Sequence, residues 1–269
     1  MNAIIFSKDR ACQLELLLRS MQELAPVFLK HVAIIYRVSS DSFLEGYRKL
    51  QDQWPRLRWM LENKSFKEMV IDAVDETPPH TLFFVDDLVF RKKWDGSQSR
   101  GYQSFCANSK VLCYSLRISK HLTFCHPKNA KEYSPVFSGN CWSWAGCTPT
   151  YAYPMSVDGH IFRTGEILVD LVNLDYENPN SLEGILVQRS WLRGRCPLMS
   201  CDKESTIFGI PANLVNTVYK NRSMGGSAEE LNQRWLDGER IALEPLIGYP
   251  NKAVHEEVEY TFEKAHEPQ

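Results

Sequence analysis

Residues 81–91, TLFFVDDLVFR, decide how the sequence is interpreted. The stretch opens with β-branched and aromatic residues, which is the composition of a buried strand. Two adjacent carboxylates, Asp86 and Asp87, follow it, and a desolvated charge must find a partner. At the carboxyl end of a strand in an open α/β sheet, such groups face the crevice where ligands usually bind. A plain Asp-Asp turn after a strand is the simpler alternative, and the residues before the pair decide between the two.

The eighty residues before this stretch alternate short apolar runs with segments of helical periodicity. The expected strands are 3–6, 31–38, 57–61 and 81–85, and the expected helices are 12–24, 41–53 and 65–74. This order predicts a mainly parallel, doubly wound sheet with right-handed crossovers. Because the carboxyl ends of parallel strands share one edge, the turns at 7–10, 39–40 and 86–87 should meet at one crevice.

Composition excludes several classes of protein. The chain has 269 residues, 43% of them hydrophobic and 24% charged, and a formal net charge of -2, which fits an ordinary globular protein rather than a nucleic-acid binder. The turn after the first strand has neither GxGxxG nor GxxxxGK[ST], so a dinucleotide site and a P-loop are not expected. The sequence MNAIIFSKDR does not resemble a signal peptide, and no apolar run is long enough to span a membrane, so we expect a cytoplasmic protein. Eight cysteines without a CxxC pair predict free thiols rather than a zinc site.

The second half has fewer signals. Residues 105–119 predict a helix, and 141–144 predict an edge strand whose Trp142 and Trp144 either pack in the core or form a wall for stacking sugars. Asp158 and His160 flank Gly159 in an expected turn, while Asn180 or Ser181 is expected to cap a helix with Glu183 in its first turn. Further expectations are capping boxes at 65–68 and 227–230, a helix from about Pro211, and a frayed end over 255–269.

The first half resembles a known family. The first strand, the turn FSKDR at 6–10 with Gln13 after it, three further β-α units and a strand ending in Val85-Asp86-Asp87 are similar to the nucleotide-sugar-binding half of GT-A fold glycosyltransferases. The pair would be a variant of the family's DxD motif, with Leu88 where a third carboxylate often lies. The resemblance implies one GT-A-like domain over 1–269, an α/β fold with a doubly wound, mainly parallel mixed sheet flanked by helices. Residues 1–120 would bind the donor and 121–269 the acceptor.

The resemblance also implies roles for individual residues. The nucleotide diphosphate sugar would contact five residues, namely Ser7, Asp9, Arg10, Ser39 and Asp86. Mn²⁺ or Mg²⁺ would bind Asp87 and Asp86, and His160 is either a further ligand or a structural residue. Glu183 would be the general base of an inverting transfer, with Asp158 as its rival, and without a base a retaining mechanism stays open. The late histidines His255 and His266 are weaker candidates for a metal ligand.

The acceptor implied by the resemblance is a glycan or a lipid-linked precursor, which leaves peripheral association with a membrane open. Two alternatives come from other classes of protein. A sugar-nucleotide nucleotidyltransferase also uses carboxylates and Mg²⁺, although the expected Gly-rich basic loop after its first strand is not present in FSKDR. A catalytically silent binding module on the same fold is the second alternative.

Overall fold

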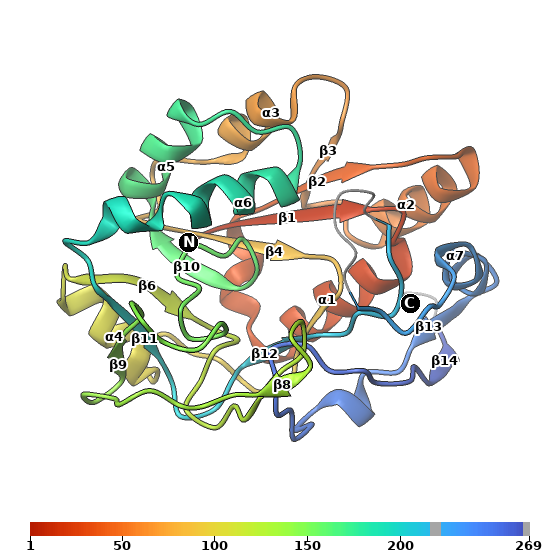
Figure 1. Cartoon of the computed structure of the whole chain (residues 1–269). Coiled ribbons are helices and arrows are strands. Elements are labelled where there is room, and N and C mark those ends of the chain that lie inside the picture. Colours follow the sequence, from red (N-terminus) through yellow and green to blue (C-terminus); the bar gives the residue numbers. More distant parts are fainter. Residues whose placement is uncertain (216–221, 266–269) are drawn as a thin grey trace.

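An eight-stranded sheet forms the centre of the computed structural model, which describes residues 1–215 and 222–265 (Figure 1). Four parallel strands make its first half, in the order β3-β2-β1-β4. Their bounds are β1 Asn2–Lys8, β2 Val32–Arg37, β3 Arg58–Leu61 and β4 His80–Val85. The doubly wound start expected from the sequence is therefore confirmed.

The second half of the chain extends the same sheet beyond β4 with mixed strand directions. Strand β10 (His160–Arg163) is antiparallel to β4, and it also pairs with β6 (Val111–Ser115). Strand β11 (Leu198–Cys201) lies parallel to β6, and β9 (Cys141–Ser143) closes the edge. A mainly parallel mixed sheet flanked by helices is the GT-A-like fold class that the sequence predicts.

Helices cover both faces of the sheet. Helices α1 (Ala11–Leu24), α2 (Asp41–Gln53) and α7 (Ala228–Leu236) contact one another on one face, next to α4 (Arg100–Ala107). The other face carries α3 (Phe66–Ala73), α5 (Thr164–Asn173) and α6 (Pro179–Gln188), which Figure 1 shows grouped together. Short pairs complete the fold, namely β5 (Leu88–Phe90) with β12 (Ile207–Gly209), β7 (Phe124–Cys125) with β8 (Ala130–Lys131), and β13 (Glu239–Ile241) with β14 (Phe262–Lys264).

The continuous apolar run of β1 follows from its place inside the sheet. Ala3 and Ile5 pack toward α1 and α2, whereas Ile4 and Phe6 pack toward α3 on the opposite face. Successive side chains of a strand point to opposite faces, so a strand covered on both sides needs apolar residues at every position. The same burial explains the run that precedes Asp86.

Several expectations for secondary structure are wrong. Residues 105–119 form the end of α4 and then β6, because a strand buried on both faces lacks the alternation that separates strand from helix. No helix starts at Pro211 over 211–215, and Asn216, expected to continue it, lies outside the described residues. Ser65 makes no side-chain cap. At 227–230 only half of the expected capping box forms, because Ser227 Oγ accepts from the Glu230 amide while the Glu230 side chain does not return a bond. The end of the chain is not frayed up to residue 265, since Phe262–Lys264 pairs as β14.

Within the described residues, no helix is both long and apolar enough to cross a membrane. All eight cysteines are free thiols, as expected.

Candidate active site

The three polar turns meet at the carboxyl edge of the parallel strands. Asp9 adopts a positive φ of 56°, and its Oδ1 accepts a hydrogen bond of 2.7 Å from the Ser39 amide at the end of β2. The Lys8 amide, at the end of β1, donates to Asp86 Oδ2 at 3.0 Å at the end of β4. The sequence therefore predicts correctly that these turns converge.

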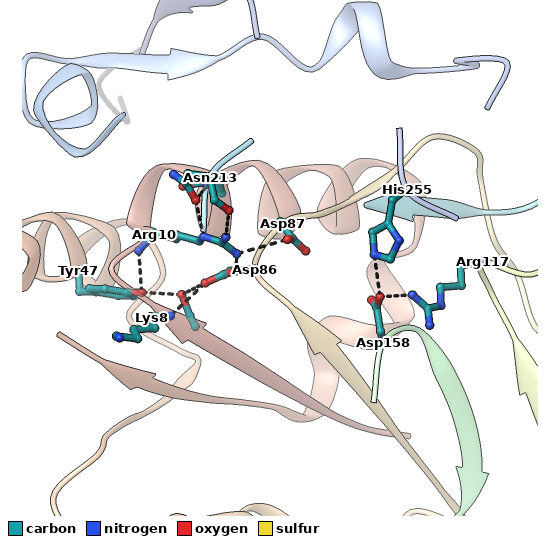
Figure 2. A network of polar contacts seen from close by, with 11 residues as sticks. Lys8, Arg10, Tyr47, Asp86, Asp87, Arg117, Asp158, Asn213 and His255 are labelled. Carbon is teal, nitrogen blue, oxygen red and sulfur yellow. Dashed lines mark hydrogen bonds and ion pairs between the residues drawn. The ribbon is translucent and has the colours of Figure 1, made fainter. Parts of the chain in front are cut away.

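Both carboxylate oxygens of Asp86 already have partners. Oδ2 accepts from Ser7 Oγ at 2.8 Å as well as from the Lys8 amide, and Oδ1 pairs with Arg10 Nη1 at 2.9 Å (Figure 2). Ser7 Oγ is itself 2.5 Å from the Tyr47 hydroxyl. A buried carboxylate with a donor on each oxygen is fixed in place.

Arg10 joins the two carboxylates to a distant segment. Its Nη1 also lies 3.3 Å from Asp87 Oδ2, and its Nε donates to Asn213 Oδ1 at 2.7 Å. A further bond runs from Nη2 to the Asn213 carbonyl. Burial alone lowers the pKa of the Arg10 guanidinium, but Asp86 and then Asp87 raise it above its ordinary value. The guanidinium is therefore a permanent cation between the two carboxylates.

Asp87 is less well satisfied than its neighbour. Its Oδ1 is buried and has no hydrogen-bond partner among the described residues, and Oδ2 shares Arg10 with Asp86. Burial raises the pKa of Asp87 to about 6, because the attraction of Arg10 is opposed by the charges of Asp86 and Asp158. Of the two carboxylates in the motif, Asp87 is the one with an oxygen that no described residue satisfies.

A second arginine centre lies along the same edge, where the chain enters β10. Gly159 has a φ of 74°, and the preceding Asp158 pairs with Arg117. His255 Nε2 lies 3.4 Å from the same Asp158 Oδ2 (Figure 2). Burial raises the pKa of Asp158, but Arg117 and then His255 outweigh it and lower the pKa to about 2.

Glu183 reaches this second centre through Ser156. We expected Asn180 or Ser181 to cap helix α6, but its N-cap is Asn178. Asn178 forms a capping box with Ser181, which is the third residue of the helix. Glu183 is thus past the first turn. Its Oε1 accepts from Ser156 Oγ at 2.6 Å and from the Val157 amide at 3.2 Å. Ser156 Oγ also accepts a hydrogen bond of 2.7 Å from Arg117 Nη2. Because Arg117 pairs with Asp158, one chain of polar contacts connects Glu183 to Asp158.

His160 lies apart from the acidic pair. Its side chain is fully buried in β10, where Nδ1 is 3.3 Å from the Pro154 carbonyl and 3.8 Å from Cys113 Sγ. Burial, followed by Arg117, lowers the pKa of His160 to about 3, so the imidazole is neutral. Over residues 1–215 and 222–265, no three His, Cys, Asp or Glu side chains are grouped as a set of metal ligands. His266 lies outside the described residues.

Trp142 and Trp144 are core residues. Both indoles are buried, and their N–H groups donate to the carbonyls of Tyr151 at 2.9 Å and Cys196 at 3.0 Å. Core packing, one of the two alternatives left open by the sequence, is therefore the role of this pair.

Sequence reasoning missed Arg117 and Asn213 and gave His255 a different role. Asn213 is 203 residues from Arg10, and Arg117 is 41 residues from Asp158. The available signal was weak, because single polar residues in loops are common. Both of these contacts join segments that are distant in the sequence and are brought together by the tertiary fold.

No protein-family model matches the sequence, and no curated protein matches it significantly. Among solved structures, residues 1–349 of TarS from S. aureus in complex with UDP give a TM-score of 0.48 at 9% identity, covering 78% of this chain and 60% of that one. The mannosyltransferase PcManGT from Pyrobaculum calidifontis, in complex with GDP-Man and Mn²⁺, gives 0.32 at 11% identity, covering 67% and 50%. The 4-diphosphocytidyl-2C-methyl-D-erythritol synthase from Anaerococcus prevotii gives 0.37 at 10% identity, covering 78% and 90%. Similarity this distant establishes neither a family nor an activity.

Proposed function

We propose that this protein is a glycosyltransferase that binds a nucleotide diphosphate sugar at the carboxyl edge of β1 and β4 and transfers the sugar to a hydroxyl acceptor. One observation carries the proposal. Asp87, at the end of β4, has a buried oxygen without a hydrogen-bond partner among the described residues, and its other oxygen lies beside the Arg10 guanidinium. Carboxylate and cation together suit a ligand that carries phosphate groups, and the crevice at strand ends is the usual ligand site of such sheets.

The donor set at this edge fits one divalent cation. Mg²⁺ and Mn²⁺ prefer oxygen ligands, and Mg²⁺ often takes only one or two protein carboxylates, with water and substrate phosphates completing its shell. Asp87 Oδ1 would supply such a ligand, whereas Asp86 is held by Arg10, Ser7 and Lys8 and acts as a positioning residue. When bound, the ion would offset the negative charge that develops on the leaving diphosphate.

The remaining residues have roles that follow from their contacts. Asp9 holds the Ser39 amide and so fixes the turns on which the nucleoside would rest. Asp158 is a poor proton acceptor, because its pKa is about 2. Glu183 is the better general base, since both its hydrogen bonds to Ser156 and Val157 use Oε1. Direct base catalysis by Glu183 would invert the anomeric centre.

Binding tests the donor site. A panel of nucleoside diphosphates and their sugars, titrated calorimetrically with and without Mn²⁺, should contain one nucleoside diphosphate that binds at least tenfold more tightly with the ion (about 1.4 kcal/mol). Asp87→Asn should abolish that difference, while Asp52→Asn, at an exposed site on α2, should leave it unchanged. Binding that is Mn²⁺-independent in the wild type, or unaffected by Asp87→Asn, would contradict the metal assignment. No binding by any member of the panel would favour a silent module.

Turnover tests the base. Glu183→Gln should bind the donor as the wild type does but transfer sugar roughly 100-fold more slowly or worse, the usual scale of a lost general base. Wild-type turnover by this variant would reject Glu183 as the base.

A further inference from the structure

The turn that follows α6 exposes two large apolar side chains between arginines. Trp191 is 72% exposed and Leu192 is 51% exposed, both in the 3-10 helix Ser190–Arg193. Arg189 and Arg195 are exposed on either side, and residues 189–195 (RSWLRGR) contain no acidic residue. Arg189, Trp191, Leu192 and Arg195 are together called the Arg-Trp surface below. An indole this exposed is unusual, because tryptophan contributes more apolar area than any other side chain.

The turn is held in a fixed place on the molecule. Arg193 pairs with Asp170 of α5, and its Nη2 also lies 3.4 Å from the Glu166 carbonyl. Arg189 and Arg195 have no acidic partner within 4.0 Å among the described residues, so their charges are available. Val169 and Val172, on either side of Asp170 in the sequence, add exposed apolar area on α5. Figure 1 shows α6 running to the edge of the molecule beside α5.

We infer that the Arg-Trp surface binds an anionic phospholipid membrane. Tryptophan and leucine enter the boundary between head groups and acyl chains, where an amphipathic ring is most stable. Free arginines next to them are attracted by the negative surface potential of such a membrane. The net charge of the whole chain is -2, so the attraction is local and fixes the orientation in which the protein docks. This inference goes beyond the proposed transfer reaction and does not depend on it.

The charges of the Arg-Trp surface disfavour a second copy as its occupant. A twofold contact brings the same patch of both copies together, so Arg189 and Arg195 would face their own counterparts. Like charges across an interface cost free energy. A lipid surface supplies the opposite charge and an apolar layer at once.

Vesicle flotation tests this inference with the complete chain. The wild type should bind vesicles made of equal parts phosphatidylglycerol and phosphatidylcholine, and it should bind pure phosphatidylcholine at least about tenfold more weakly because the electrostatic attraction is lost. The variants Trp191→Ser/Leu192→Ser and Arg189→Gln/Arg195→Gln should each reduce binding to the anionic vesicles by about tenfold or more. Tyr133→Ser/Val136→Ser is the matched control, because these residues are 63% and 94% exposed at another surface, and it should bind like the wild type.

Circular dichroism checks that each variant stays folded, as expected for exposed positions. The inference is overturned if the wild type does not float with anionic vesicles, or if the control pair loses binding as strongly as the Trp191/Leu192 pair. It is also overturned if analytical ultracentrifugation finds a wild-type dimer that Trp191→Ser/Leu192→Ser dissociates, because the surface would then be an interface between copies.

Discussion

Two buried arginines lie along the same edge of the sheet, and they leave their carboxylates in different states. Arg10 has to compensate both Asp86 and Asp87, whereas Arg117 compensates Asp158 alone and His255 Nε2 lies beside the same carboxylate. The pKa of Asp87 is consequently raised to about 6, mainly by burial, while that of Asp158 is lowered to about 2 in spite of burial. The ratio of cations to carboxylates, rather than depth of burial, separates the two centres.

This difference assigns different uses to the two centres. A carboxylate that is short of cations gains most from a divalent ion, so Asp87 is the place where a metal and its phosphate ligand would be stabilised. Asp158 has one arginine to itself and an imidazole beside it, so it is suited to holding Arg117 and His255 in position. Four measurements would break or sharpen the comparison.

The largest effect is expected from removal of the shared cation. Arg10→Met leaves two buried carboxylates without compensation, and we expect a loss of about 3–5 kcal/mol in the free energy of unfolding measured with urea. Arg117→Met should cost less, because His255 still faces Asp158. The exposed control Arg56→Met should change stability by less than about 0.5 kcal/mol. If Arg117→Met were less stable than Arg10→Met, the ratio of cations to carboxylates would not explain the difference between the two centres.

Asp87→Asn should stabilise the metal-free protein at neutral pH. The native pKa of about 6 lies above the ordinary value of 3.8, so the native state binds more protons between these values and wild-type stability falls as pH rises through them. Asparagine does not ionise, so the stability of the variant does not fall in this way as the pH rises. We expect it to exceed the wild type by about 2–3 kcal/mol near pH 7.5 and to match it near pH 4, in urea titrations at both values. If the variant and the wild type were equally stable at both pH values, burial would not raise the pKa of the Asp87 carboxyl.

Asp158→Asn should change the free energy of unfolding in the opposite direction and destabilise the protein at neutral pH. The native pKa of about 2 lies below 3.8, so the ionised carboxylate contributes stability that is fully present above 3.8 and is lost as pH falls toward 2. We expect the variant to lose about 2 kcal/mol or more at neutral pH, and progressively less in acid. Thermal unfolding followed across this range measures the change, and a stabilised variant at neutral pH would break the comparison.

The smallest effect concerns a neutral donor. Ser7→Ala removes one hydrogen bond to Asp86 and leaves the Lys8 amide and Arg10 in place, so a loss of about 1 kcal/mol is expected from urea unfolding. Ser97→Ala, at an exposed position, is the control. A loss as large as that of Arg10→Met would mean that Ser7, and not the arginine, holds Asp86.

The fold of the first half follows from local signals. Each of the three β-α units, and the strand that follows them, carries its own pattern of apolar residues. The rules for parallel sheets then place Ser7, Asp9, Ser39 and Asp86 at one edge. Strand β6 could not be recognised in this way, because burial on both faces removes the alternation on which a strand assignment depends.

The side chains that contact Asp86, Asp87 and Asp158 could not be predicted from local sequence patterns. Asp86 and Asp87 look equivalent in sequence, and what distinguishes them is where one arginine and one amide from residue 213 come to lie. His255 reaches Asp158 because Gly209 lacks a side chain, since a Cβ there would lie 2.6 Å from the imidazole ring. Such contacts arise from tertiary packing, which a single sequence does not specify.

The most direct test follows the carboxyl carbons of Asp87 and Asp158 by NMR in metal-free protein over a pH titration, with Asp87→Asn and Asp158→Asn to assign the signals. We expect Asp87 to titrate near pH 6 and Asp158 to remain ionised down to about pH 2. Addition of Mg²⁺ near neutral pH should shift the Asp87 signal and leave that of Asp158 in place. Two carboxylates that titrate together near 4, or a Mg²⁺ response at Asp158 alone, would contradict the account.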